Sequence, residues 1–393
     1  MAEIIRTNLG LSSGRLLQFF RDGEPHTKAE LANLTGLARS TVSLRLDPLL
    51  ALGIIGPMTD ATSTGGRPSA RLQLKDDAFV VGAVSFGATH AQASLADLSG
   101  KILVSIEAKR QISDGPEVCL RWMTSELKYL LAGLGIQEDR LLVIGIGIPG
   151  PVEHTTGRPA NPPIMPGWDA FDIPERVNRE IQAKVLVDNE VNMMALGERF
   201  INFPEVENLI FLKAATGIGS GIIAGGMLQR GAQGTAGDIG HVRTLVGTDV
   251  ACHCGNFGCL EAIAGAPAII RRVNEAGLPI RNTSDLIDAT RRSKVEAIRA
   301  VRQAGRDIGE VLSTCVSLLN PEIIVIGGSL SSAGEHLIAG VREVVYGRST
   351  PLASENLTIV QSRDSKGEIV GAAVMAIDYA LDDATIDQML EAM

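Results

Sequence analysis

Long apolar stretches are missing from this chain of 393 residues: no run approaches the ~20 residues needed to span a bilayer. The first residues, MAEIIRTNLG, also lack a basic segment followed by an apolar one, so they do not resemble a secretory signal. We therefore expect a cytoplasmic protein without a membrane partner. The length predicts two or three compact units, and the 45% hydrophobic and 21% charged residues are ordinary for a soluble globular protein.

Cysteine is scarce as well, but three of the five cysteines lie between residues 252 and 259. In a reducing compartment such clustering favours a metal site over disulfides. Three thiolates on a Gly-rich loop can converge on one ion, and tetrahedral zinc needs a fourth ligand. We choose His241, with His253 as the competitor, because His253 stands between two of the thiolates and should point away. Four protein ligands would make the site closed and structural.

Positive charge is unevenly distributed along the chain. Residues 1–75 hold nine Lys and Arg against six Asp and Glu, which is +3, while the remainder holds 27 against 39, which is −12. A small basic unit on an acidic body predicts an anionic partner for that unit alone.

The N-terminal segment predicts a small helical unit followed by a β-hairpin. Thr27 and Glu30 form a capping-box pattern that starts one helix, and Gly36 provides the turn that ends it. A second helix follows, and Pro48 inside its pattern should kink or shorten it. Residues 54–75 have the pattern of two short strands around a Ser/Thr/Gly-rich tip. This order is typical of a winged helix-turn-helix.

In a helix-turn-helix the second helix enters the major groove and reads base edges. Arg can bond guanine through two hydrogen bonds, and Ser or Thr can bond bases or phosphates. An Arg in the flexible tip of the wing would suit a minor groove. The alternative is a three-helix unit that binds a protein. The candidate DNA-binding residues are Arg39, Ser40, Thr41, Ser43, Arg45 and Arg67.

Beyond residue 75 strands alternate with helices, which implies an α/β body. Two strands end in Gly-containing turns at residues 85–89 and 216–221, and a third such turn follows the strand at 323–326. Gly at these turns lets backbone amides approach phosphate, so a nucleotide could lie in a cleft between two halves. The candidate phosphate-loop residues are Gly87, Thr89, Thr216, Gly217, Gly219, Gly327 and Gly328.

Polar side chains accumulate between these loops, while aromatic residues make up only 4% of the chain. Carboxylates and amides with few aromatics suit a hydroxyl-rich ligand. Each residue alone could be a helix cap or a loop residue, but the set, joined by the zinc ligand, predicts a sugar site. Its members are Asn161, Asn189, Glu190, Asp238, His241 and Glu261.

Together these motifs resemble the ROK family of repressors, open reading frames and sugar kinases, in its branch of sugar-responsive repressors. The resemblance covers essentially the whole chain. Its most specific part is the stretch Ala236-Gly237-Asp238-Ile239-Gly240-His241 followed by Cys252-x-Cys254-Gly-x-x-Gly-Cys259-Leu-Glu261. The supporting matches are Pro149-Gly150-Pro151-Val152, Asn189-Glu190-Val191-Asn192, Thr216-Gly217-Ile218-Gly219 and Ile326-Gly327-Gly328.

The resemblance implies a winged helix-turn-helix at 1–75 followed by a two-lobed, actin-like ATPase domain of the hexokinase type at 76–393. Lobe one would span about 76–188 plus the C-terminal helix, and lobe two about 189–368. The family is usually dimeric, so we expect a homodimer or a dimer of dimers on a palindromic operator. It implies structural zinc on His241, Cys252, Cys254 and Cys259, and a sugar bonded by the six polar residues named above.

Three departures from the kinases concern the reaction centre. The Asp that begins their first phosphate loop is Ser85 here, and the Asp that acts as general base is Glu190, one methylene longer. A misplacement of about 1 Å can cost roughly 100-fold in rate. The usual Glu before the Gly-His pair is Asp238. A fourth departure lies in the head, where Ala38 replaces a Ser that often caps the recognition helix.

These departures favour binding without phosphoryl transfer, with Glu190 as a vestigial base. The sequence therefore predicts a sugar-responsive repressor that binds operator DNA and is not an enzyme, and it leaves open whether ATP with Mg²⁺ binds. The alternatives are an active ATP-dependent sugar kinase with a regulatory DNA-binding head, and a protein-binding head on a scaffold.

Overall fold

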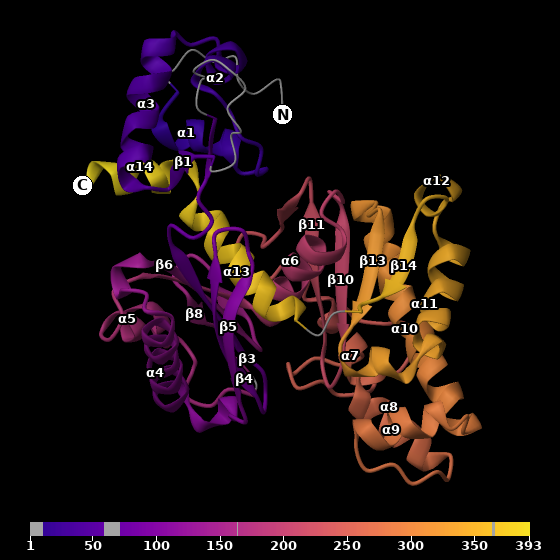
Figure 1. The fold of residues 1–393 in the computed structure, drawn as a ribbon. Helices are drawn as coiled ribbons and strands as arrows, with labels where there is room; N and C mark the ends of the chain where they lie inside the picture. The colour runs from indigo at the N-terminus through magenta and orange to yellow at the C-terminus, as the bar shows by residue number, and fades with distance from the viewer. Residues whose placement is uncertain (1–10, 59–70, 163, 364–365) are drawn as a thin grey trace.

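The computed structural model describes residues 11–58, 71–162, 164–363 and 366–393, and Figure 1 shows a small helical head above two larger lobes. We call residues 11–58 and 71–75 the head. Its helical elements are α1 (Ser13–Leu17), the 3₁₀ segment η2 (Gln18–Phe20), α2 (Lys28–Thr35) and α3 (Arg39–Leu52). Its strands, which pair antiparallel as the sequence predicts, are β1 (Ile55–Pro57) and β2 (Leu72–Leu74). The hairpin tip with Arg67 lies outside the described residues.

Local signals in the head act largely as expected. The Thr27 hydroxyl accepts from the Glu30 amide at 3.1 Å, and the Glu30 carboxylate accepts from the Thr27 amide at 2.7 Å, which completes the capping box. Gly36 ends α2 with φ of 72°. Ala38 begins α3 without a side-chain cap.

Of the two predicted effects of Pro48, a kink or a shortening, the shortening is wrong, because α3 continues to Leu52; the kink stays a prediction. A proline inside a helix costs about 3 kcal/mol. Leu46 and Leu49 on either side of it are completely buried, and each such burial contributes about 1.5–3 kcal/mol. Packing of these two side chains offsets the missing hydrogen bond.

The lobe next to the head is built on a five-stranded mixed sheet of order β5-β4-β3-β6-β9. The first three strands are antiparallel, and β3, β6 and β9 run parallel. Their bounds are β3 (Val80–Phe86), β4 (Ala91–Asp97), β5 (Ile102–Ala108), β6 (Leu141–Ile148) and β9 (Lys184–Asn189). One face is covered by α4 (Pro116–Leu134) and α5 (Ile173–Asn178), and a small pair, β7 (Val152–Glu153) and β8 (Arg158–Pro159), precedes α5.

The second lobe repeats this strand order and these directions as β12-β11-β10-β13-β14. The strands are β10 (Leu209–Ala214), β11 (Ile218–Ala224), β12 (Met227–Leu228), β13 (Ile323–Gly327) and β14 (Thr358–Gln361). The outer helices are α7 (Leu260–Ala264), α8 (Ala266–Glu275), α9 (Thr283–Arg291), α10 (Val295–Leu319), α11 (Glu335–Arg348) and α12 (Pro351–Ser354). Two lobes of equal topology are the arrangement expected of an actin-like fold.

Two helices lie between the sheets, α6 (Glu190–Asn202) against the second lobe and α13 (Gly367–Ala380) against the first (Figure 1). They cross at very short distance because glycines meet backbone there. A Cβ on Gly197 would lie 1.8 Å from the Gly367 carbonyl oxygen, and one on Gly371 would lie 1.8 Å from that of Met193. Contacts this close leave the two helices little freedom to move separately.

The C-terminal part returns to the head. Helix α14 (Asp383–Glu391) packs against α1, and the apolar residues of the head, α13 and α14 form one continuous core. Gln18 donates to the Leu381 carbonyl at 2.7 Å, and Arg21 is ion-paired with Asp378. The expected single C-terminal helix is thus two helices, the second of which completes the head. The proposed domain boundaries remain a prediction.

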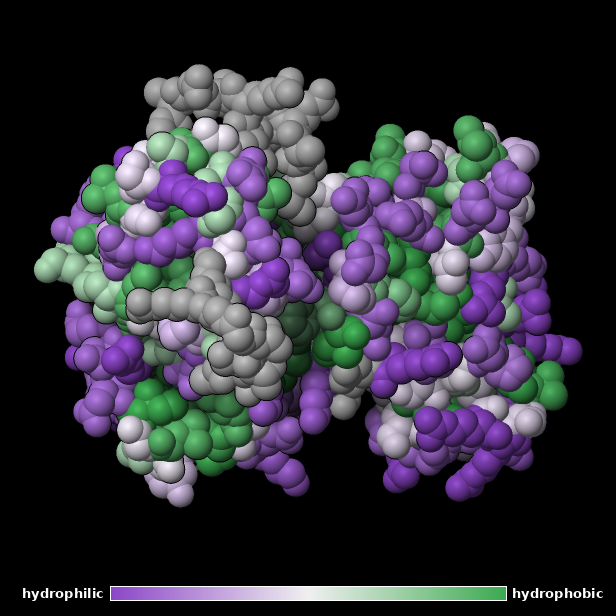
Figure 2. All heavy atoms as spheres, turned by 45° about the horizontal axis from the view of Figure 1, so that its top comes forward, coloured by the Kyte–Doolittle hydropathy of each residue, from purple (hydrophilic) through white to green (hydrophobic). Residues whose placement is uncertain are grey.

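On the face shown in Figure 2, hydrophilic side chains prevail and apolar ones gather in separate patches. Within the described residues, no helix combines the length and apolar character required to cross a membrane.

Candidate functional site

A cleft of about 1240 Å³ opens between the two lobes. Lobe one contributes the turn after β3 and the segment after β6, and lobe two contributes the start of α6, the turn between β10 and β11, and the segment before α7. All six predicted sugar-binding residues line this cleft: Asn161, Asn189, Glu190, Asp238, His241 and Glu261.

Some of these polar groups already have protein partners. The Asn189 side chain caps α6 by accepting from the Val191 amide at 2.8 Å, and it donates to the Gly150 carbonyl at 2.8 Å. Glu261 accepts from the Ile218 amide at 3.1 Å. These contacts fix the walls of the cleft, whereas Asn161 and Asp238 are exposed to it.

The predicted phosphate loops divide into two groups. Gly87, Thr89, Thr216, Gly217 and Gly219 line the cleft. The pair at the end of β13, Gly327 and Gly328, does not line it; the lining residue of that turn is Ser329. The third loop therefore faces the cleft one residue later than the sequence predicts.

A network of ionisable groups lies at the base of the cleft. The Glu190 carboxylate, where the kinases carry their base, is buried and ion-paired with Lys213 of β10. Behind it, the Ser85 hydroxyl donates to Glu368 in the first turn of α13. Burial, together with the nearby charge of Glu190, raises the pKa of the Glu368 carboxyl to about 7.

Lys213 and Glu368 are absent from the residues predicted by sequence. Each has a signal in the sequence, since Lys213 interrupts the apolar strand 209–214 and Glu368 directly precedes the apolar run 369–377. An ionisable residue inside an apolar element is rarely buried unless it is paired. The partners come from distant parts of the chain, so the pattern alone could not identify them.

The thiols converge as the sequence predicts, and the structure places His241 with them. The ligand atoms of His241, Cys252, Cys254 and Cys259 all lie within 4.8 Å of one another. A regular zinc tetrahedron requires about 3.8 Å between two sulfurs and about 3.6 Å between sulfur and nitrogen. The Cys254 and Cys259 sulfurs are 3.7 Å apart, and Cys252 Sγ lies 3.6 Å from His241 Nδ1. The donor set fits zinc, and His253 is outside it.

The surroundings of this cluster also suit a cation. The amide of Asn256 lowers the pKa of the Cys254 thiol to about 7, whereas burial raises that of Cys259 to about 12. A bound cation would keep the buried sulfur as thiolate. His241 Nε2 lies 3.9 Å from an Asp238 carboxylate oxygen, so the ring links the metal cluster to the cleft wall.

The predicted DNA-reading residues share the outer side of α3. Arg39, Ser40 and Arg45 are exposed, and Thr41 and Ser43 are half-buried. Neither arginine forms an ion pair with any residue that the structure describes. Leu44, which the sequence analysis did not select, is 68% exposed on the same helix. Its place outside the apolar spacing of α3 was the available signal, and an exposed apolar side chain there suits a thymine methyl group.

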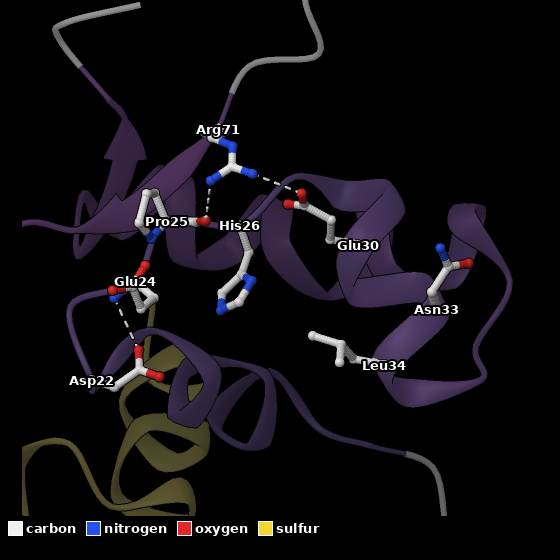
Figure 3. A pocket seen from close by; sticks show the side chains of 8 residues that line it. All are labelled: Asp22, Glu24, Pro25, His26, Glu30, Asn33, Leu34 and Arg71. Atoms are coloured by element: carbon white, nitrogen blue, oxygen red, sulfur yellow. Dashed lines mark hydrogen bonds and ion pairs between the residues drawn. The ribbon is translucent and has the colours of Figure 1, made fainter.

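A second, shallow hollow lies on the head itself (Figure 3). Arg71, at the base of the wing, donates to Glu30 at 2.8 Å and to the Pro25 carbonyl at 3.2 Å. Asp22 and Glu24 add two acidic groups to the lining of the hollow, which also includes His26, Asn33 and Leu34. The two bonds of Arg71 hold the β1–β2 hairpin against α2. We therefore interpret the hollow as a structural contact of the hairpin.

Comparisons with known proteins agree with this architecture. A family model described as the ROK family matches residues 81–379. The xylose repressor of Caldicellulosiruptor bescii is 28% identical over 93% of this chain and 95% of its own length, and a glucokinase of Halalkalibacterium halodurans is 29% identical over 68% and 85%. The solved structure of a ROK family transcriptional regulator, described as a homologue of the E. coli MLC protein, has a TM-score of 0.84 at 23% identity, covering 98% of this chain and 99% of that one.

Proposed function

The chain belongs to the ROK family, and we propose that it is a sugar-responsive transcriptional repressor whose head, residues 1–75, binds operator DNA. The observation that carries the proposal is the continuous core that joins the head to α13, the helix that begins behind the ligand cleft. The xylose repressor aligns over nearly the whole chain and the glucokinase over about two thirds, which supports a regulator that kept the kinase fold.

The head would bind with α3 in the major groove. Arg39 and Arg45 would contact guanines or phosphates, and Ser40, Thr41, Ser43 and Leu44 would contact neighbouring bases. Arg67 would follow into the minor groove from the wing tip. In a homodimer or a dimer of dimers, two heads would occupy half-sites about 34 Å apart on a palindromic operator.

The cleft would hold a sugar or sugar derivative between Asn161, Asn189, Glu190, Asp238 and Glu261, with His241 fixing one wall. Zinc on His241, Cys252, Cys254 and Cys259 would supply structural cross-linking and leave no position for a catalytic water. Three thiolates and a metal are compatible with the reducing cytoplasm, where we place the protein.

The cleft favours binding over phosphoryl transfer. A general base must accept a proton from the sugar hydroxyl, but the Glu190 carboxylate is already held by Lys213. Ser85 cannot supply the metal-binding carboxylate of the kinases. We therefore place ATP with Mg²⁺ outside the working cycle. A coupled ATP-consumption assay over a sugar panel checks this, and turnover of even ~1 per second would establish the alternative, an active kinase with a regulatory head.

Gel shift on the intergenic DNA upstream of the chain's own gene tests repression. We expect specific binding that weakens steeply with salt and changes on adding D-xylose, D-glucose or N-acetylglucosamine. Arg39→Ala should weaken binding about 5- to 150-fold, the equivalent of ~1–3 kcal/mol. The control Arg299→Ala, an exposed arginine of α10, should have no effect. Binding that ignores salt, or equal effects of both variants, would contradict a DNA-reading head.

A further inference from the structure

The carboxylate that the kinases carry on β3 is lost at Ser85, but a carboxylate still reaches this point from another element. The Ser85 hydroxyl donates to Glu368, which stands in the first turn of α13. A Cβ on Gly147 would lie 3.7 Å from a Glu368 carboxyl oxygen and 3.8 Å from the Glu190 Cα, so the two acidic residues approach the same point of β6. Glu368 does not line the cleft, whereas Glu190 and Lys213 do.

We infer that Glu368 is a coupling residue, through which a sugar bound at Glu190 shifts helix α13 and thereby the setting of the head. This inference rests on the proposed function and adds the route of its regulation. Four elements meet at the network: β3 through Ser85, α6 through Glu190, β10 through Lys213 and α13 through Glu368. Ser85 and Glu368 join β3 to α13, Lys213 and Glu190 join β10 to α6, and the charge interaction between Glu190 and Glu368 links the two pairs.

Charge is the means by which occupancy of the cleft reaches Glu368. The Glu190 carboxylate pairs with the Lys213 ammonium through Oε1 and can accept further hydrogen bonds, so a sugar hydroxyl that bonds it shares the carboxylate with Lys213, which is 21% exposed and faces the cleft. Glu190 raises the pKa of the Glu368 carboxyl and Lys213 lowers it, so a change in their pairing alters the balance of charge at Glu368. Its contact with Ser85 then strengthens or weakens, although the sugar never touches it.

Helix α13 can carry such a change over a distance. Its 14 residues span about 21 Å, from Glu368 to the neighbourhood of the head. Near its far end Asp378 pairs with Arg21, and after it the Leu381 carbonyl accepts from Gln18 at 2.7 Å. Asp387 of α14 then accepts from the Gly14 amide at 2.9 Å.

The packing of α13 favours its movement as one unit together with α6 and β6 over local bending. Besides the contact of Gly371 with Met193, a Cβ on Gly145 of β6 would lie 2.2 Å from the Ala372 carbonyl oxygen. Tight backbone contacts on two sides prevent the middle of the helix from absorbing a displacement of its first turn. A displacement of the first turn of α13 at Glu368 therefore also displaces the far end of the helix, where it contacts Arg21 and Gln18 of the head.

The test measures coupling, defined as the ratio of the operator Kd with and without a saturating sugar. The probe is D-xylose, D-glucose or N-acetylglucosamine, whichever raises the Tm of the full chain most. Glu368→Gln keeps the size of the side chain and removes its charge; we expect the ratio to fall from roughly ten-fold or more towards one. Ser85→Ala, which removes the hydroxyl partner, should reduce the ratio in the same direction. The control Glu343→Gln changes a surface glutamate of α11 and should leave it unchanged.

The outcomes separate this inference from the proposed function. If no sugar of the panel alters operator binding by the wild type, the proposed function fails and the inference with it. If the wild type responds and Glu368→Gln responds equally, only the inference is overturned. Should Glu368→Gln fail to fold, Ser85→Ala decides alone. Hydrogen exchange in residues 371–391 of the sugar-free variant gives a second reading, and exchange identical to wild type counts against the route.

Discussion

Among single residues, the fourth ligand of the thiol cluster gives the most direct test of the zinc assignment. His241 and His253 are both close to the cysteines in sequence, but only His241 places a ring nitrogen among the sulfurs. We expect His241→Ala to lose bound zinc and to lower the Tm, because one of four ligands is missing. The measurement is zinc content by mass spectrometry of the purified protein. His253→Ala is the matched control and should keep about one zinc per chain; loss of metal in both variants would contradict the assignment.

Glu368 also predicts a pH dependence of stability. Its pKa rises from 4.5 to about 7 on folding, so between these values the unfolded chain releases a proton that the folded chain retains. Folded protein is therefore disfavoured as pH rises through this window, by a total on the order of 3 kcal/mol. The Tm of the wild type, relative to Glu368→Gln, should fall from pH 4.5 to pH 7.5.

Glu343→Gln is the control for the direction in which Tm changes with pH. Hydrogen bonds from Arg306 and Arg302 lower the pKa of Glu343, so its contribution is present above its unfolded pKa and is lost towards low pH. Relative to Glu343→Gln, the wild-type Tm should change in the opposite direction. A flat difference for Glu368→Gln would show that this carboxyl is not desolvated.

Sequence reasoning identified the four residues that converge as a possible metal site and the six polar residues of the cleft, because each belongs to a local motif or follows a strand end. It missed Lys213 and Glu368, whose roles depend on partners from other elements: Lys213 is 23 residues from Glu190, and Glu368 is 283 residues from Ser85. Only the folded chain brings such groups together.

Among the elements, α3 begins without a side-chain hydrogen bond at its N-cap, and a single substitution can supply one. Ala38 already has the extended backbone of an N-cap, with φ of −62° and ψ of 144°, but no side-chain acceptor. Ala38→Ser should stabilise the first turn by about 1 kcal/mol, which slows exchange of the Thr41 amide roughly five-fold. Ala51→Ser, near the other end of the same helix, controls for serine itself and should not slow this amide.

Element boundaries were predictable where tertiary packing did not oppose the local sequence preference. The capping box of α2 and its terminal glycine agree with the structure, whereas Pro48 does not shorten α3, because tertiary packing of Leu46 and Leu49 outweighs its effect. The strands of the first lobe's sheet, and β10 and β13 of the second, were predicted from their apolar patterns, whereas β11, β12 and β14 were not. That the two sheets share one strand order was not predicted either, because pairing partners leave little trace in a single sequence.

For the molecule as a whole, the contact between α1 of the head and the C-terminal helix α14 can be weakened by adding one methyl group at Gly14. A Cβ on Gly14 would lie 2.1 Å from the Asp383 carbonyl oxygen, so Gly14→Ala must separate α1 from α14. We expect a cost of about 1–3 kcal/mol and loss of the sugar response while the cleft still binds sugar. Thermal unfolding and the operator titration measure the two effects.

Gly133→Ala is the matched control, since its Cβ would meet nothing within 4 Å near the end of α4. It should be neutral or stabilise by about 0.5–1 kcal/mol. A Gly14→Ala protein that unfolds and responds like wild type would show that the head is not held through this contact.

The closure of the head by α14 has a consequence for synthesis of the chain. The first helices leave the ribosome long before residues 383–391 exist, and until then the side of α1 that packs against α14 is uncovered. The core of the head is therefore complete only when translation has passed α14. Premature termination before that helix would yield a polypeptide that has the strands of both lobes but lacks the helix that completes the head.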